Sequence, residues 1–299
     1  MSLVFQSASQ VVALMWMMVV LFAVEIHMTL FSRFAPHSQD VPVALIDALR
    51  QAHRLVIFSG AGMSAESGIP TFREAMHGLW AQFDPQELAS PEGWDEDQAR
   101  VWAWYEWRRG LVMRAEPHAG HVAIPQLAHA LSCFTGHEVC VDVVTQNVDD
   151  LHERAGEADV QHLHGSLFAP RCTTCGKPGE FAGLPPLEPI ERIVPPRCQY
   201  CPGFLRPGVV WFGESLPRGA WHQAENLIAS CDVLLVVGTS GVVYPAASLP
   251  AAARQAGKWV AEINPTSSEL SSHVNLHWQT TAAQGLGGLL HVLTTQGAA

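Results

Sequence analysis

Several polar side chains directly follow an apolar run that is typical of a buried β-strand. The run at residues 139–144 is rich in β-branched residues, and Gln146, Asn147 and Asp149 come just after it. Because open α/β sheets bind their ligands at the carboxyl ends of parallel strands, we expect these side chains to take part in chemistry. The alternative is that Asn147 or Asp149 only caps a helix that starts at Leu151.

His164 is the candidate general base. It lies in the sequence HLHGS at residues 162–166, between the polar turn and the first pair of cysteines. An imidazole can take up a proton near neutral pH, which is what general-base catalysis requires. A single histidine among the 15 of this chain is more often structural, so its position alone leaves both roles open.

A glycine-rich stretch at residues 60–73, GAGMSAESGIPTFR, follows the apolar run 55–58 without a gap. Gly60 and Gly62 allow a tight turn close to a ligand, and Ala65 is small enough for a helix to pack on a sheet. The helix start offers free N–H groups to a pyrophosphate. The pattern predicts a dinucleotide site, although a plain structural turn fits it as well.

Two neighbouring features qualify this interpretation. An ordinary dehydrogenase has an acidic residue at the end of a second strand roughly 20 residues further on, whereas residues 80–85 read WAQFDP and do not end a strand. Arg73 adds a fixed charge that could bind a phosphate or brace the loop. We therefore expect a dinucleotide to bind in a variant manner.

Four cysteines form two Cys-x-x-Cys pairs, Cys172 with Cys175 and Cys198 with Cys201. This spacing is typical of a zinc ribbon, in which four thiolates complete a tetrahedral site and leave no position for water. We expect one structural Zn²⁺ that holds together a segment too proline-rich to build its own core. Two disulfides are the alternative, which the absence of a convincing secretory signal disfavours.

The composition is that of a globular protein. The chain has 299 residues, 48% of them hydrophobic, and its net charge of −11 disfavours non-specific binding to nucleic acid or to anionic membranes. Residues 1–40 are an apolar N-terminal extension of unknown role, whose uncharged part at 11–24 is short for a membrane span. We expect a cytoplasmic protein without direct nucleic-acid binding, with membrane contact through residues 11–31 as the weaker alternative.

Strand and helix patterns alternate along the rest of the chain. Apolar, β-branched runs predict strands at residues 55–58, 139–144, 209–212, 233–237 and 259–263. The spacing of apolar residues at 43–49 predicts a helix before the first strand. This alternation predicts an α/β fold with a doubly wound, mostly parallel, Rossmann-like sheet at residues 41–299. A proline-, cysteine- and glycine-rich segment at about 167–206 interrupts it, which indicates a small inserted zinc-binding domain.

The chain resembles the sirtuins, the NAD-dependent protein lysine deacylases, over a region from about residue 42 to near the C-terminus. The motifs that carry the resemblance occur in the family's order, namely GAGMSAESGIPTFR at 60–73, TQNVDDLHERAG at 145–156, HLHGS at 162–166, the two cysteine pairs, PGVVWFGE at 207–214, GTSGVVYPAA at 238–247 and EINP at 262–265. The resemblance also accounts for the missing acidic residue, because in this family an asparagine after a late strand, here Asn264, binds the adenosine ribose.

The resemblance implies that NAD is a cosubstrate. The implied contacts are Gly60, Ala61, Gly62, Ala65, Glu66, Thr71, Phe72 and Arg73, then Gln146, Asn147, Val148 and Asp149, and finally Gly238, Thr239, Ser240 and Asn264, with Ala282 near the adenine. In the implied reaction the amide oxygen attacks the nicotinamide ribose as nicotinamide leaves, and His164 acts as general base on a ribose hydroxyl. Asn147 and Asp149 position ribose and water. The products are free lysine, nicotinamide and an O-acyl-ADP-ribose, and zinc takes no part.

The resemblance also implies that an acyl-lysine peptide or protein binds as an extended strand between the two domains. Its backbone would pair with Val210, Trp211, Phe212 and Gly213, a mode of binding that reads few side chains. We expect the protein to act as a monomer.

Tyr105 and Arg108, within WYEWRR at 104–109, resemble the Tyr-x-x-Arg signature of class III sirtuins, which remove succinyl, malonyl and glutaryl groups. Three residues apart on a helix, they project from the same face and could hold one carboxylate together. The loop at 74–79 is one residue longer than that class suggests, so the charge of the pocket is better defined than its size. The alternatives are a general lysine deacetylase, a sirtuin-type ADP-ribosyltransferase and a zinc-ribbon nucleic-acid binder, the last disfavoured by the acidic charge.

Overall fold

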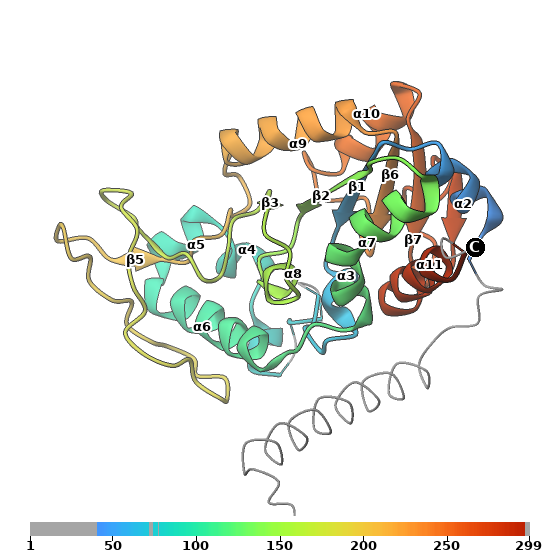
Figure 1. Ribbon diagram of the computed structural model, residues 1–299. Helices are drawn as coiled ribbons and strands as arrows, with labels where there is room; N and C mark the ends of the chain where they lie inside the picture. Colours follow the sequence, from blue (N-terminus) through green and yellow to red (C-terminus); the bar gives the residue numbers. More distant parts are fainter. Residues whose placement is uncertain (1–40, 72–73, 77, 297–299) are drawn as a thin grey trace, which may run out of the picture.

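The computed structural model describes residues 41–71, 74–76 and 78–296. They form a layered α/β lobe built on one sheet and a smaller lobe of helices and extended segments (Figure 1). The N-terminal extension, with its predicted membrane contact at 11–31, lies outside the described residues, and so do Phe72 and Arg73 of the glycine-rich stretch.

The central sheet has six parallel strands in the order β3-β2-β1-β6-β7-β8. They are β1 (Arg54–Ser59), β2 (Cys140–Thr145), β3 (Val160–His162), β6 (Val233–Val237), β7 (Trp259–Ile263) and β8 (Leu276–Trp278). The strand order reverses between β1 and β6, and doubly wound sheets bind their ligands at the carboxyl ends of the strands beside such a reversal. The predicted doubly wound, Rossmann-like fold is confirmed.

Helices cover both faces of this sheet (Figure 1). One face packs against α2 (Val43–Arg50), α7 (Ala119–Thr135) and α11 (Ala282–Gln296), and the other against α9 (Arg218–Ser230) and α10 (Ser248–Gln255). Strand side chains alternate between the two faces, so Leu55 and Ile57 enter one apolar core while Val56 and Phe58 enter the other. Burial on both faces explains why β1 and β6 are continuous apolar runs.

The smaller lobe has a tryptophan-rich core of its own. Its elements are η2 (Gly78–Gln82), α4 (Pro85–Leu88), α5 (Pro91–Glu96), α6 (Gln98–Arg114) and the antiparallel pair β4 (Arg171–Cys172) and β5 (Leu205–Arg206). The longest of these, α6, is buried on almost every side, with Trp104 fully enclosed. Two short helices, α3 (Gly62–Ala65) and α8 (Leu151–Arg154), follow β1 and β2 along the chain.

The strand predicted at 209–212 does not belong to the sheet. The Val210 N–H donates to the His164 carbonyl at 2.8 Å, and the Phe212 N–H donates to the Ala89 carbonyl at 2.8 Å. Because these two partners belong to different segments, residues 209–212 connect the segments and do not form a continuous β-ladder with either one. Its apolar residues are explained by the core of the smaller lobe, which buries Val209 and Trp211.

Candidate active site

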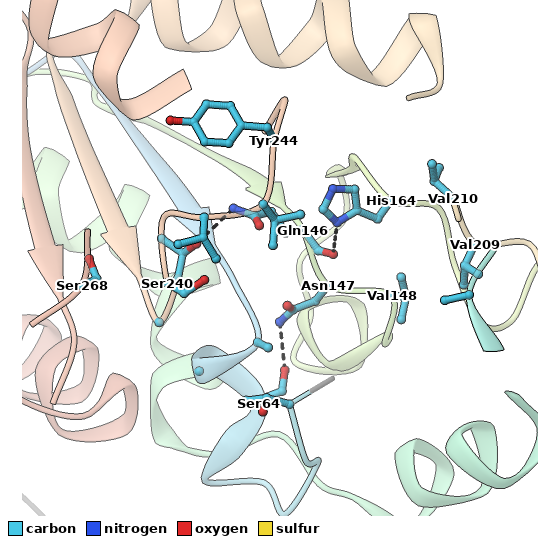
Figure 2. Close-up of a pocket in the computed structure, with 18 of the residues that line it drawn as sticks. Ser64, Gln146, Asn147, Val148, His164, Val209, Val210, Ser240, Tyr244 and Ser268 are labelled. Atoms are coloured by element: carbon cyan, nitrogen blue, oxygen red, sulfur yellow. Dashed lines mark hydrogen bonds between the residues drawn. The ribbon is translucent and has the colours of Figure 1, made fainter. Parts of the chain in front are cut away.

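One cavity of about 1110 Å³ is lined by the loops that follow β1, β2, β6 and β7 and by residues of the smaller lobe (Figure 2). The loops after β1 and β6 flank the strand reversal, which is where doubly wound folds bind ligands. The predicted site residues that line it are Ala61, Gly62, Thr71, Tyr105, Arg108, Gln146, Asn147, Val148, Asp149, His164, Val210, Trp211, Phe212, Gly213, Gly238, Thr239, Ser240 and Asn264. The structure thus brings together residues predicted for the cosubstrate, for catalysis and for the acyl group.

Two glycines let the loops after β1 and β6 touch backbone to backbone. The Gly62 N–H donates to the Gly238 carbonyl at 2.7 Å, and a Cβ atom on Gly62 would lie only 2.8 Å from the Gly238 Cα. Gly238 has a φ of 61°, a conformation that favours glycine. The contact places Ala61, Gly62 and Ser64 at the cavity wall, although the N–H groups of Gly62, Met63 and Ser64 already donate to the carbonyls of Gly238, Gly60 and Ala61.

Ser64 joins Asn147 to Asp149 at the floor of the cavity. The Asn147 Nδ2 donates to the Ser64 Oγ at 3.1 Å (Figure 2), and that hydroxyl donates to the Asp149 Oδ2 at 2.9 Å. The other carboxylate oxygen accepts from the Leu151 N–H at 3.2 Å, so Asp149 also satisfies the start of α8. Burial raises the pKa of Asp149, against the opposing effect of these hydrogen bonds.

His164 presents one basic nitrogen. Its Nδ1 lies 2.9 Å from the carbonyl oxygen of Gln146 (Figure 2), and because a carbonyl can only accept, Nδ1 carries the proton and Nε2 keeps its lone pair. Burial lowers the pKa of His164, although the Gln146 hydrogen bond raises it in part. The imidazole is therefore neutral at neutral pH, which is the state that a general base requires.

Tyr105 and Arg108 reach the cavity from α6, a helix that begins where Asp97 accepts from the Arg100 N–H at 3.0 Å. The Arg108 guanidinium carbon lies 5.0 Å from the centre of the Trp104 ring. Burial raises the pKa of Tyr105 and lowers that of Arg108, opposed by the attraction between them. The phenol stays protonated, and the guanidinium stays charged. An anion at this point would gain hydrogen bonds from both.

A segment of the inserted domain at residues 180–194, the strap, packs along α6. Arg109 donates to both carboxylate oxygens of Glu106, at 2.9 and 2.8 Å, and to the Gly183 carbonyl at 3.0 Å. Its guanidinium also lies over the Phe181 ring, at 3.8 Å from the ring centre. Both charged side chains are buried. The strap therefore holds the helix that forms one side of the cavity.

The four cysteines form a site with the dimensions of a zinc centre. The sulfur atoms of Cys172 and Cys201 are 3.4 Å apart, those of Cys175 and Cys198 are 3.7 Å apart, and all four lie within 4.8 Å of one another. Disulfide sulfurs would be about 2.05 Å apart, whereas Zn–S bonds of about 2.3 Å in a tetrahedron separate the sulfurs by about 3.8 Å. The donor set fits one structural Zn²⁺.

A few predicted contacts lie elsewhere. Gly60, Ala65, Glu66 and Ala282 do not line the cavity. The Glu66 carboxylate instead accepts from the Ala283 N–H at 2.8 Å, at the beginning of α11, where an anion is favoured by the helix dipole.

Sequence reasoning missed several residues that line the cavity: Ser64, Ile69, Pro70, Tyr244, Ser267 and Ser268. Ser64 lies inside the glycine-rich motif, so its polar side chain in the first helical turn was the available signal.

The fold and the site define a dinucleotide-dependent enzyme with a cysteine-bound metal domain. The profile of the Sir2 family matches residues 60–245. An "NAD-dependent protein deacylase" of Corynebacterium glutamicum is 49% identical over 251 residues, which cover 83% of this chain and 95% of that protein. The chain belongs to the Sir2 family.

Solved structures agree with this assignment. A Sir2 homologue in complex with NAD has a TM-score of 0.75 at 40% identity and covers 88% of this chain and 98% of its own. A Sir2 complex with a p53 peptide and NAD⁺ has a TM-score of 0.68 at 25% identity, with 83% and 96% covered. The family, the enzyme class and the dependence on NAD that the sequence predicts are confirmed. Among the described residues, no helix is long and apolar enough to cross a membrane.

Proposed function

We propose that this protein is an NAD-dependent lysine deacylase that prefers acidic acyl groups, namely succinyl, malonyl and glutaryl. The observation that carries the proposal is that Tyr105 and Arg108 line the same cavity as His164. The catalytic base would then act on the ribose beside the amide, while the pair binds the carboxylate at the far end of the acyl group. The reaction gives free lysine, nicotinamide and an O-acyl-ADP-ribose.

The electrostatics of α6 support an anionic occupant. Burial lowers the pKa of Arg108, and an anion beside its guanidinium would favour the charged form. The free carboxylate of a succinyl group could accept from the guanidinium and from the Tyr105 hydroxyl, in charge-assisted hydrogen bonds. An acetyl group offers no such acceptor.

The roles of the remaining residues follow from their hydrogen bonds. NAD supplies the ribose carbon that accepts the amide oxygen as nicotinamide leaves. His164 would take a proton at Nε2 from a ribose hydroxyl, because Nδ1 is committed to Gln146. Asn147 and Asp149, held by Ser64, would orient the ribose and water.

The peptide would bind along residues 210–213 through backbone carbonyl groups, of which that of Trp211 also accepts from the Glu214 N–H at 3.0 Å. The N–H groups of Val210, Trp211 and Phe212 already donate within the protein, to His164, Glu214 and Ala89 in turn. We therefore propose that the peptide supplies the donors at this edge.

The test is to measure kcat/KM for succinyl- and acetyl-lysine in one peptide sequence, with the variant Tyr105→Phe/Arg108→Met beside wild type. Losing the carboxylate contact should lower succinyl hydrolysis by about 10- to 150-fold, equivalent to roughly 1.5–3 kcal/mol. Acetyl hydrolysis should change much less, so that the preference reverses. Arg114→Met, an exposed arginine in the last turn of the same helix, is the control for charge. Equal loss of both activities would contradict the proposal.

A further inference from the structure

Glu262 is a buried carboxylate beside the cavity. It lies on β7, two residues before Asn264, and its side chain is fully buried. Because strand side chains alternate, it shares a face with Val260 and points toward the apolar core that also contains Leu270. Burying a carboxylate in such a core is unfavourable unless hydrogen bonds replace its water.

Three donors replace that water. The hydroxyls of Ser268 and Ser271 each donate to Glu262 at 2.5 Å, and the Asn264 Nδ2 donates at 3.3 Å. Ser268 lines the cavity (Figure 2), whereas Ser271 does not. The carboxylate therefore ties the end of β7 to the loop at 265–271, which forms one wall of the cavity.

The same contacts fix the orientation of the Asn264 amide. Its Nδ2 donates to the Thr239 carbonyl at 3.0 Å as well as to Glu262. Both partners only accept, so the amide nitrogen must face them, and its two hydrogens are used. Asn264 lines the cavity, and its Oδ1 is left as the atom that can accept from a ligand.

We propose that Glu262 is a positioning residue for the cosubstrate, which orients Asn264 so that Oδ1 accepts from a hydroxyl of the adenosine ribose. Dinucleotide sites of this fold usually place an acidic side chain directly on the ribose. Here the acidic side chain acts indirectly, through its hydrogen bond with Asn264. The inference rests on the proposed binding of NAD and is independent of the acyl group.

The first measurement is the Kd of NAD, without peptide, for wild type and Glu262→Gln. Glutamine has no charge and one acceptor oxygen in place of two, so the hydrogen bonds that hold Asn264 and its loop weaken and the Kd should rise by up to about tenfold. The KM for NAD should rise in parallel, while kcat and the KM for acyl-lysine peptide stay near their wild-type values. Glu225→Gln, which removes an exposed charge on α9, is the control.

A double-mutant cycle decides whether Glu262 acts through Asn264. In an Asn264→Ala background, Glu262→Gln should have no further effect on the Kd of NAD. Additive effects, or an unchanged Kd in the single variant, would overturn the inference. If Glu262→Gln does not fold, the second variant is Ser271→Ala, which removes one hydrogen-bond donor to Glu262 from outside the cavity. It should raise the Kd of NAD by a smaller factor, and this rise should disappear in the Asn264→Ala background. Failure of wild type to bind NAD would instead overturn the cosubstrate assignment.

Discussion

One end of the cavity is formed mainly by backbone groups and the other mainly by side chains. At the sheet end, the loops after β1 and β6 meet through the backbones of Gly62 and Gly238. At the other end, α6 presents the side chains of Tyr105 and Arg108, and it is held by the strap of the inserted domain. The sheet end is determined by the topology of the fold, whereas the α6 end depends on two side chains and on packing.

This difference indicates how each end can change. A dinucleotide site made of backbone contacts tolerates few substitutions, because any Cβ on Gly62 would collide with the neighbouring loop. An acyl site made of side chains on one helix can be altered by two substitutions without disturbing the sheet. We therefore expect perturbations at the two ends to have separable effects.

The largest effect should follow from loss of zinc. We expect about one zinc per chain, and replacing Cys198 with Ser should lower the stability and the soluble yield, since structural zinc sites contribute on the order of 10 kcal/mol to folding. Because the strap belongs to the zinc-bound domain, peptide binding should be lost before NAD binding. The measurements are the zinc content per chain, the thermal unfolding temperature, and the Kd values of NAD and of peptide.

Cys133→Ser, which changes an exposed cysteine on α7, is the matched control for the loss of zinc. A zinc-free protein that is stable and fully active would contradict the ribbon interpretation.

Removing the base should abolish turnover and leave both ends of the cavity intact. We expect His164→Ala to lower kcat by about 100- to 10,000-fold, with the Kd values of NAD and of peptide close to wild type. His291→Ala, at an exposed position on α11, is the control. Near-normal turnover of the variant would show that another group takes the proton.

The pH dependence should report the burial of His164. Its pKa is lowered from the usual 6.5 by burial, and the reactive form is the neutral one. Activity should therefore persist below pH 6.5 and fall only as pH drops through the lowered pKa. The measurement is kcat/KM as a function of pH between about 5 and 9. An acidic limb centred at or above 6.5 would contradict the assigned environment.

The sequence predicts the structure best where a pattern of residues is compatible with a single kind of local structure. The β-branched runs predict the central strands. Gly60 and Gly62 predict a tight turn close to a ligand, and in the structure Gly62 also permits the close approach to Gly238. The cysteine spacing predicts a cluster that the sulfur distances match.

Other features depend on which distant segments meet. Ser64 bonds to both Asn147 and Asp149, although it lies far from them in the chain. The run at 209–212 has the composition of a strand, but its N–H groups bond to separate segments. The contact of Glu66 with α11 likewise requires the two elements to be adjacent in space. No local pattern specifies these partners.

The most direct test of the account is the acyl preference of the wild-type enzyme. One peptide sequence carrying acetyl-, succinyl-, malonyl- or glutaryl-lysine should be assayed with saturating NAD, and kcat/KM compared. We predict that the acidic acyl groups react faster than acetyl, because only they can occupy Tyr105 and Arg108 together. Faster hydrolysis of acetyl-lysine would contradict the proposal and identify the protein as a general deacetylase.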